Sequence, residues 1–152
     1  MKIITFENRN DLNEISFHDC CFYDYCYSYG ERIITLRCDN DWLKKEFKIC
    51  FNNVVYHEMI GCCFWGDESC YINWAGYSPC ETIFEKLSQL QAKADEKRVA
   101  NNKGSGFDSP FFLLKKTNWN SGIQYVPMLF EFASGDTLII LAEEIVVEVH
   151  EW

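Results

Sequence analysis

The sequence predicts an α+β domain: a mainly antiparallel sheet, arranged as a sandwich or open barrel, with one long helix packed on it. Turn signals at residues 29–30 and 134–135 each separate runs rich in aromatic and β-branched residues, as in β-hairpins. Only residues 79–100 show the 3.6-residue apolar period of a helix. Helices and strands do not alternate, which favours antiparallel pairing. The length of 152 residues predicts a single domain over residues 1–152.

The first predicted hairpin joins residues 17–28 to residues 31–38 through a two-residue turn. That turn sets three pairs of cross-strand neighbours on one face. The pairs are Tyr25 with Ile34, Tyr23 with Leu36, and Cys21 with Cys38.

A third strand is predicted over residues 43–51, where apolar and polar residues alternate. Its inward-facing side chains are Phe47, Ile49 and Phe51. Residues 52–53 are a turn candidate, and a strand over residues 54–60 follows. Residues 61–77 are aromatic and are expected to be irregular.

Residues 79–100 carry the signals of an amphipathic helix. Ser78 and Glu81 form a capping box, with Pro79 at the first helical position. The apolar residues of one face are Ile83, Phe84, Leu87, Leu90 and Ala94. We expect this stripe, with Phe84 and Leu87, to be buried on the sheet.

The second predicted hairpin joins residues 124–133 to residues 136–149. Its turn sets two cross-strand pairs, Phe130 with Ile139 and Met128 with Leu141. Pro127 indicates that the first of these strands lies at an edge or contains a bulge. A further short strand is predicted over residues 111–116.

Charge and hydropathy exclude several classes of function. The chain has 14 Lys and Arg against 23 Asp and Glu, a formal net charge of −9. Nucleic acid phosphates and anionic lipids attract basic surfaces, so we expect neither nucleic acid nor membrane as a partner. No apolar run approaches the roughly 20 residues of a membrane span. Because residues 1–7 lack signal-peptide features, we expect a cytoplasmic protein.

The nine cysteines are expected to be reduced thiols, because the number is odd and the expected compartment is reducing. The potential zinc ligands are His18, Cys20, Cys21, His57, Cys62 and Cys63. No Cys-x₂-Cys spacing occurs, and adjacent residues on a strand point to opposite faces. We therefore expect no metal and no other cofactor. The pair expected to oxidise most readily is Cys21 with Cys38.

No catalytic motif occurs, and no catalytic residue is predicted. His18 and Cys20 are two residues apart on a predicted strand, which separates them by about 7 Å. That is too far for the hydrogen bond that activates a nucleophile. The adjacent carboxylates Glu143 and Glu144 point to opposite faces of a strand and cannot form one acid–base pair.

Acidic residues are segregated along the chain. Residues 49–85 and 117–152 contain no Lys or Arg. Such stretches provide solubility, or they attract a basic partner protein. Aromatic anchors with a charged rim suit an interface. The candidate partner-binding residues are Trp65, Asp67, Glu68, Trp74, Glu143, Glu144 and Glu148.

Four segments together carry a resemblance to known proteins. They are Phe17-His18-Asp19-Cys20, Phe51-Asn52-Asn53-Val54, Phe64-Trp65-Gly66 and residues 130–138. This pattern resembles small uncharacterised bacterial β-rich proteins, some of which are similar to immunity proteins of toxin systems. The resemblance rests on turns and core positions, so it implies a fold and a binding role and transfers no active-site residue.

Two classes of function remain open. The first is a cytosolic acidic protein-binding module, for example an immunity protein that neutralises a basic, toxin-like bacterial protein. The alternative is an enzyme or small-ligand-binding protein that uses a pocket of the sheet lined by His18, Cys20 or His57. A purely structural module of an assembly is a third reading.

Overall fold

The computed structural model of the chain describes residues 1–61, 70–79 and 123–152, together with residues 85, 89, 92–93 and 96–97. The chain divides into two compact units. One consists of Met1–Pro79 and Gln124–Trp152, and the other of Cys80–Ile123. All the strands given below belong to the first unit.

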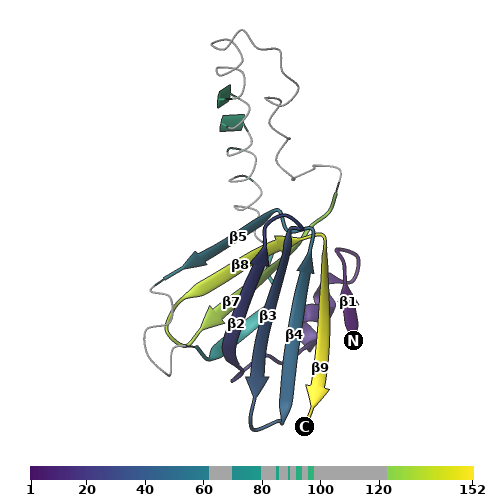
Figure 1. Ribbon diagram of the computed structural model, residues 1–152, viewed down its shortest axis with the longest axis vertical. Coiled ribbons are helices and arrows are strands. Elements are labelled where there is room, and N and C mark those ends of the chain that lie inside the picture. The colour runs from purple at the N-terminus through teal and green to yellow at the C-terminus, as the bar shows by residue number, and fades with distance from the viewer. Residues whose placement is uncertain (62–69, 80–84, 86–88, 90–91, 94–95, 98–122) are drawn as a thin grey trace. The chain divides into compact units, whose positions relative to one another are not determined.

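Nine strands in the described part of the chain form two antiparallel sheets (Figure 1). The five-stranded sheet has the order β1-β9-β4-β3-β2, and the four-stranded sheet has the order β5-β8-β7-β6. The first contains β1 (Lys2–Ile4), β9 (Glu144–Glu151), β4 (Lys45–Asn52), β3 (Ile33–Asn40) and β2 (Cys21–Ser28). The second contains β5 (Tyr56–Ile60), β8 (Thr137–Ala142), β7 (Val126–Phe132) and β6 (Ile72–Tyr77).

The predicted α+β class is wrong, because the described residues are nearly all β. Their only continuous helical element is the short 3₁₀ helix η1 (Arg9–Glu14), and no long helix is described. The isolated described residues 85, 89, 92–93 and 96–97, which lie within the predicted helix, are helical. None of their helices has the length and apolarity to cross a membrane. Most of the predicted helix over residues 79–100, with Phe84 and Leu87, lies outside the described residues, as does the predicted strand over residues 111–116.

The two sheets bury their apolar faces against each other, which is why the fold of this unit needs no helix to cover them. Phe51 of β4 contacts Phe130 of β7, with ring centroids 6.4 Å apart. Phe22 of β2 contacts Phe132 of β7 at 5.4 Å. Each such side chain contributes about 1.5–3 kcal/mol when it is fully buried. The core is therefore made by side chains from both sheets.

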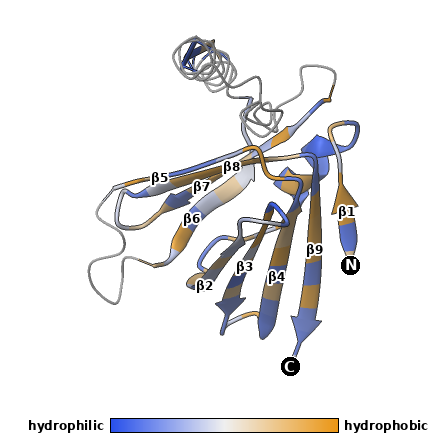
Figure 2. Ribbon diagram, turned by 45° about the horizontal axis from the view of Figure 1, so that its top comes forward, coloured by the Kyte–Doolittle hydropathy of each residue, from blue (hydrophilic) through white to orange (hydrophobic). Residues whose placement is uncertain are grey.

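The alternation predicted for the third strand is confirmed in β4. Phe47, Ile49 and Phe51 are buried, and the polar residues between them face away from the core. Hydrophobic and hydrophilic residues alternate visibly along β4 and β9 in Figure 2.

The first hairpin has a longer turn than the sequence indicated. Ser28 pairs with Ile33, so four residues form the loop, and Arg32 takes a φ of +57°. This shifts the predicted pairs by two residues, and Tyr25 lies opposite Leu36. A bulge between Phe22 and Asp24 also changes the register. The bulge reverses one residue of this shift, so Cys21 pairs with Asp39, one residue from the predicted Cys38.

The second hairpin differs from its prediction by one residue. Phe130 pairs with Leu138, and the Phe132 amide donates to the Asp136 carbonyl at 2.9 Å. This closes a three-residue loop in which Gly135 takes a φ of +88°. The observed register places buried residues opposite buried residues. Pro127 is the second residue of β7, which lies between β8 and β6, so the predicted edge position is wrong.

The strand predicted over residues 136–149 is two strands in different sheets. β8 ends at Ala142, β9 begins at Glu144, and the chain changes sheet at Glu143. A second change of sheet joins β4 to β5 beside it, and the Glu143 amide donates to the Asn52 carbonyl at 3.1 Å. Residues 72–77, predicted to be irregular, form β6.

Candidate functional site

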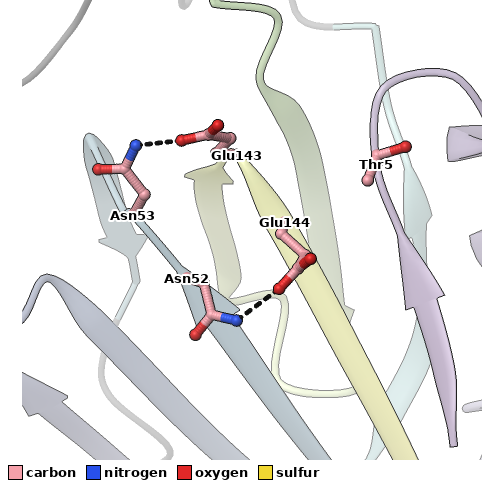
Figure 3. A pocket seen from close by; sticks show the side chains of 5 residues that line it. All are labelled: Thr5, Asn52, Asn53, Glu143 and Glu144. Carbon is pink, nitrogen blue, oxygen red and sulfur yellow. Dashed lines mark hydrogen bonds between the residues drawn. The ribbon is translucent and has the colours of Figure 1, made fainter.

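A pocket lies where the two chain segments change sheets (Figure 3). Its volume is about 280 Å³, and its lining residues are Thr5, Asn52, Asn53, Glu143 and Glu144. The Asn52 amide donates to Glu144 at 2.8 Å, and the Asn53 amide donates to Glu143. Both carboxylates therefore accept hydrogen bonds from asparagine side chains of the neighbouring segment. These bonds connect the segment that leads from β4 to β5 with the segment that leads from β8 to β9.

Glu148, the third acid predicted on the last strand, faces a lysine. It pairs with Lys48 across β4 and β9, with 3.4 Å between Nζ and Oε2. Glu151 forms a similar ion pair with Lys45 at 3.4 Å. Glu148 and Glu151 of β9 are therefore compensated by lysines of β4, whereas Glu144 accepts a hydrogen bond from Asn52.

The remaining predicted contact residues are only partly described. Trp74 lies on β6 with 40% of its surface exposed, and its ring packs over the Gly76 position. Trp65, Asp67 and Glu68 lie outside the described residues.

The residues considered for chemistry lie at separate places. His18 is exposed and 2.9 Å from the Asp19 carboxylate. Cys20 is buried in the core. His57 lies on β5, where its Nδ1 is 2.7 Å from the Tyr25 hydroxyl. Burial lowers the pKa of His57 and raises the pKa of Tyr25 to about 12, so the pair is neutral at neutral pH. The structure does not bring His18, Cys20 and His57 into one site.

The cysteines make thiol contacts that the sequence did not indicate. No disulfide joins the six described cysteines, and no group of three metal-ligand side chains is arranged for an ion among the described residues. Cys20 and Cys38 are buried together. A hydrogen bond with Cys38 lowers the pKa of Cys20, whereas that bond and burial raise the pKa of Cys38.

The turn between β3 and β4 presents large apolar side chains to solvent. Trp42 is 92% exposed and Leu43 is 52% exposed. The turn is nevertheless held in place by Asn40, a buried polar residue. The side-chain oxygen Oδ1 of Asn40 accepts from the Leu43 backbone amide at 2.9 Å, and its Nδ2 donates to the His18 backbone carbonyl at 3.1 Å. Trp42 and Leu43 are thus exposed on an ordered turn.

Further aromatic residues extend this end of the five-stranded sheet. The Trp152 amide donates to the Lys44 carbonyl at 3.1 Å, and Trp152 is exposed. Figure 1 shows the β3–β4 turn and the C-terminus at the same end of the sheet. On the other side, the exposed Tyr71 pairs with Cys21 at the start of β2. We call this set the tip surface: Asp39, Asp41, Trp42, Leu43, Tyr71 and Trp152.

The two carboxylates of the tip surface lack a cation. Neither Asp39 nor Asp41 forms an ion pair within the described part of the chain. Burial, followed by the charge of Asp41, raises the pKa of Asp39. A cation of a partner would relieve this repulsion. The tip surface therefore combines exposed aromatic side chains with two carboxylates that form no ion pair in the described part of the chain.

Sequence reasoning missed the tip surface, although its signal is present. Asn40-Asp41-Trp42-Leu43 places turn-forming residues directly before two large apolar residues, between two alternating strands.

Comparison with protein-family models, curated proteins and solved structures gave no match to this chain. The function is therefore argued from the geometry of the chain itself.

Proposed function

We propose that this chain is a protein-binding module that holds a basic partner protein through its tip surface, as an immunity protein holds a toxin. The observation that carries the proposal is Trp42, which is 92% exposed on a turn fixed by the buried Asn40. An ordered, exposed tryptophan loses little conformational entropy on binding and buries a large apolar area.

The surroundings of Trp42 favour a partner with positive charge. Hot spots of interfaces are enriched in tryptophan and are surrounded by a polar rim. Here the rim includes Asp39 and Asp41, which have no cation of their own among the described residues. Lysine or arginine of a partner would pair with them, and the net charge of −9 would speed the encounter.

Inhibition by such a module requires occlusion and no chemistry of its own. A bound partner would lose access to whatever surface the tip covers. The toxin-neutralising role rests on the resemblance of residues 17–20, 51–54, 64–66 and 130–138 to small uncharacterised bacterial β-rich proteins, some of which are similar to immunity proteins of toxin systems. The enzyme alternative has less support, because His18, Cys20 and His57 do not converge.

The test is co-purification and calorimetry with the protein that the neighbouring gene encodes, which we expect to be basic. We expect a stable complex with the wild-type chain. Trp42→Ala should weaken it by about 2–4 kcal/mol, the range of an interface hot spot. Trp74→Ala is the matched control, because Trp74 is exposed on the other sheet, and it should have little effect.

Two results would contradict the proposal separately. Loss of binding in Trp74→Ala with full binding in Trp42→Ala would move the interface to β6. Absence of any complex between the wild-type chain and the neighbouring gene product would remove the toxin-neutralising role.

A further inference from the structure

Two thiols lie in contact where the two sheets meet. Cys21 is the first residue of β2, and Cys70 precedes β6 by two residues. Their sulfur atoms are 3.3 Å apart. The backbone fixes this approach, because the Phe22 amide donates to the Cys70 carbonyl at 3.0 Å and Cys21 is bridged to Tyr71.

A second thiol pair, Cys20 and Cys38, differs from Cys21 and Cys70 in how deeply it is buried. Cys20 and Cys38 are fully buried in the core, with exposures of 0% and 1%. Cys21 and Cys70 are only partly buried, which leaves them more open to a small molecule from solution than Cys20 and Cys38. Reagent access therefore separates the two pairs.

We propose that Cys21 and Cys70 form a reversible disulfide by exchange with a small disulfide such as oxidised glutathione. One thiolate of the pair attacks a glutathione sulfur, breaks its S–S bond and releases one glutathione thiolate. The second thiolate then attacks the mixed disulfide and releases the other glutathione. Two protein thiols are oxidised, one glutathione disulfide is reduced to two thiols, and the two protons of the protein thiols pass by way of solvent to the two glutathione thiolates.

The product would join the two sheets covalently. Cys21 belongs to the five-stranded sheet, and Cys70 leads into β6 of the four-stranded sheet. Their sulfurs need to approach to about 2.05 Å from their contact distance, which a small side-chain rotation supplies. This modification does not depend on the proposed partner-binding role.

The protonation state of Cys21 sets the speed of the reaction. Burial, followed by the hydrogen bond with Cys70, raises the pKa of Cys21 to about 12. Because only the thiolate attacks, we expect slow closure at neutral pH and faster closure as the pH rises.

The experiment incubates the full chain with a glutathione redox buffer under native conditions, blocks the remaining thiols, and maps the peptides by mass spectrometry without reduction. We expect a linked peptide pair containing Cys21 and Cys70, reversed by reduced glutathione. Cys20 and Cys38 should remain thiols that the blocking reagent reaches only after denaturation.

Two variants make the result specific. In Cys70→Ser the second step is impossible, so Cys21 should keep a bound glutathione or remain reduced. Cys26→Ser is the control, because Cys26 is exposed, and it should leave the Cys21–Cys70 link unchanged. A wild-type chain in which Cys21 stays reduced or carries glutathione, or in which Cys70 links to another cysteine, would overturn the proposal.

Discussion

At the scale of single residues, Asn40 has the largest structural consequence for the tip surface. It is one of two polar residues buried in the described part of the chain, at 3% exposure. Its side chain joins the β3–β4 turn to the segment before β2 through Leu43 and His18. A buried amide with both ends hydrogen-bonded specifies one conformation, because any other leaves a desolvated polar group without a partner.

Replacing Asn40 should therefore cost stability. Asn40→Ala removes both bonds and is expected to lower the free energy of unfolding by about 1–3 kcal/mol. Urea unfolding followed by tryptophan fluorescence measures this loss. Asn10→Ala, at an exposed position, should change stability by less than about 0.5 kcal/mol. Equal stability of the two variants would show that Asn40 does not hold the turn.

At the scale of elements, alternation could be predicted from sequence and register could not. The period-two pattern of Phe47, Ile49 and Phe51 depends only on which face of β4 is buried. Register depends on the length of the turn. The loop after Ser28 includes Arg32 in a left-handed conformation. The residues that usually indicate this conformation in a sequence are glycine and asparagine, and neither occupies position 32. The longer loop and the bulge after Phe22 together place Cys21 opposite Asp39, and its sulfur contacts Cys70.

The prediction of the fold class was wrong for a related reason. The helical pattern of residues 79–100 is local and can be recognised in the sequence, whereas the packing of two sheets depends on contacts between distant strands. A continuous apolar run over residues 136–149 does not show that the chain changes sheets at Glu143. The candidate site was missed because the sequence alone does not show whether a tryptophan is exposed or buried. In the structure Trp42 is exposed, on a turn that the hydrogen bonds of Asn40 hold in place.

The backbone of the β3–β4 turn provides a test at this scale. Lys44 is exposed and has a φ of +52°, a region that β-branched residues strongly disfavour. Lys44→Val should lower the free energy of unfolding by about 1–2 kcal/mol relative to Lys44→Gly, because glycine adopts this conformation without strain.

The neighbouring position should show the opposite preference. Lys45 is the first residue of β4, where glycine weakens the strand and valine suits it. Lys45→Gly is therefore expected to be less stable than Lys45→Val in the same urea titration. The same order of stability at both positions would contradict the left-handed turn.

At the scale of the whole molecule, folding redistributes the charge that the sequence segregates. The acids of residues 117–152 have no Lys or Arg near them in sequence, but β9 pairs with β4, and Glu148 meets Lys48. The net charge of −9 remains. Within the tip surface, the acids that form no ion pair with a described residue are Asp39 and Asp41. Steering of a basic partner should therefore depend on the end of the sheet that carries Trp42, and much less on the face of β9.

This placement makes the salt dependence of association position-specific. Asp41 and Glu7 are both exposed, and neither forms an ion pair with a described residue. Asp41→Asn and Glu7→Gln each remove one negative charge, so the two variants have the same net charge. The screening length is about 8 Å at physiological salt, so a charge at the interface acts more strongly than a distant one. Stopped-flow association with the basic partner should slow several-fold for Asp41→Asn at low salt, and its salt dependence should flatten. Glu7→Gln should follow the wild-type curve. Identical curves for both variants would mean that net charge alone sets the rate and that the partner does not approach through the tip surface.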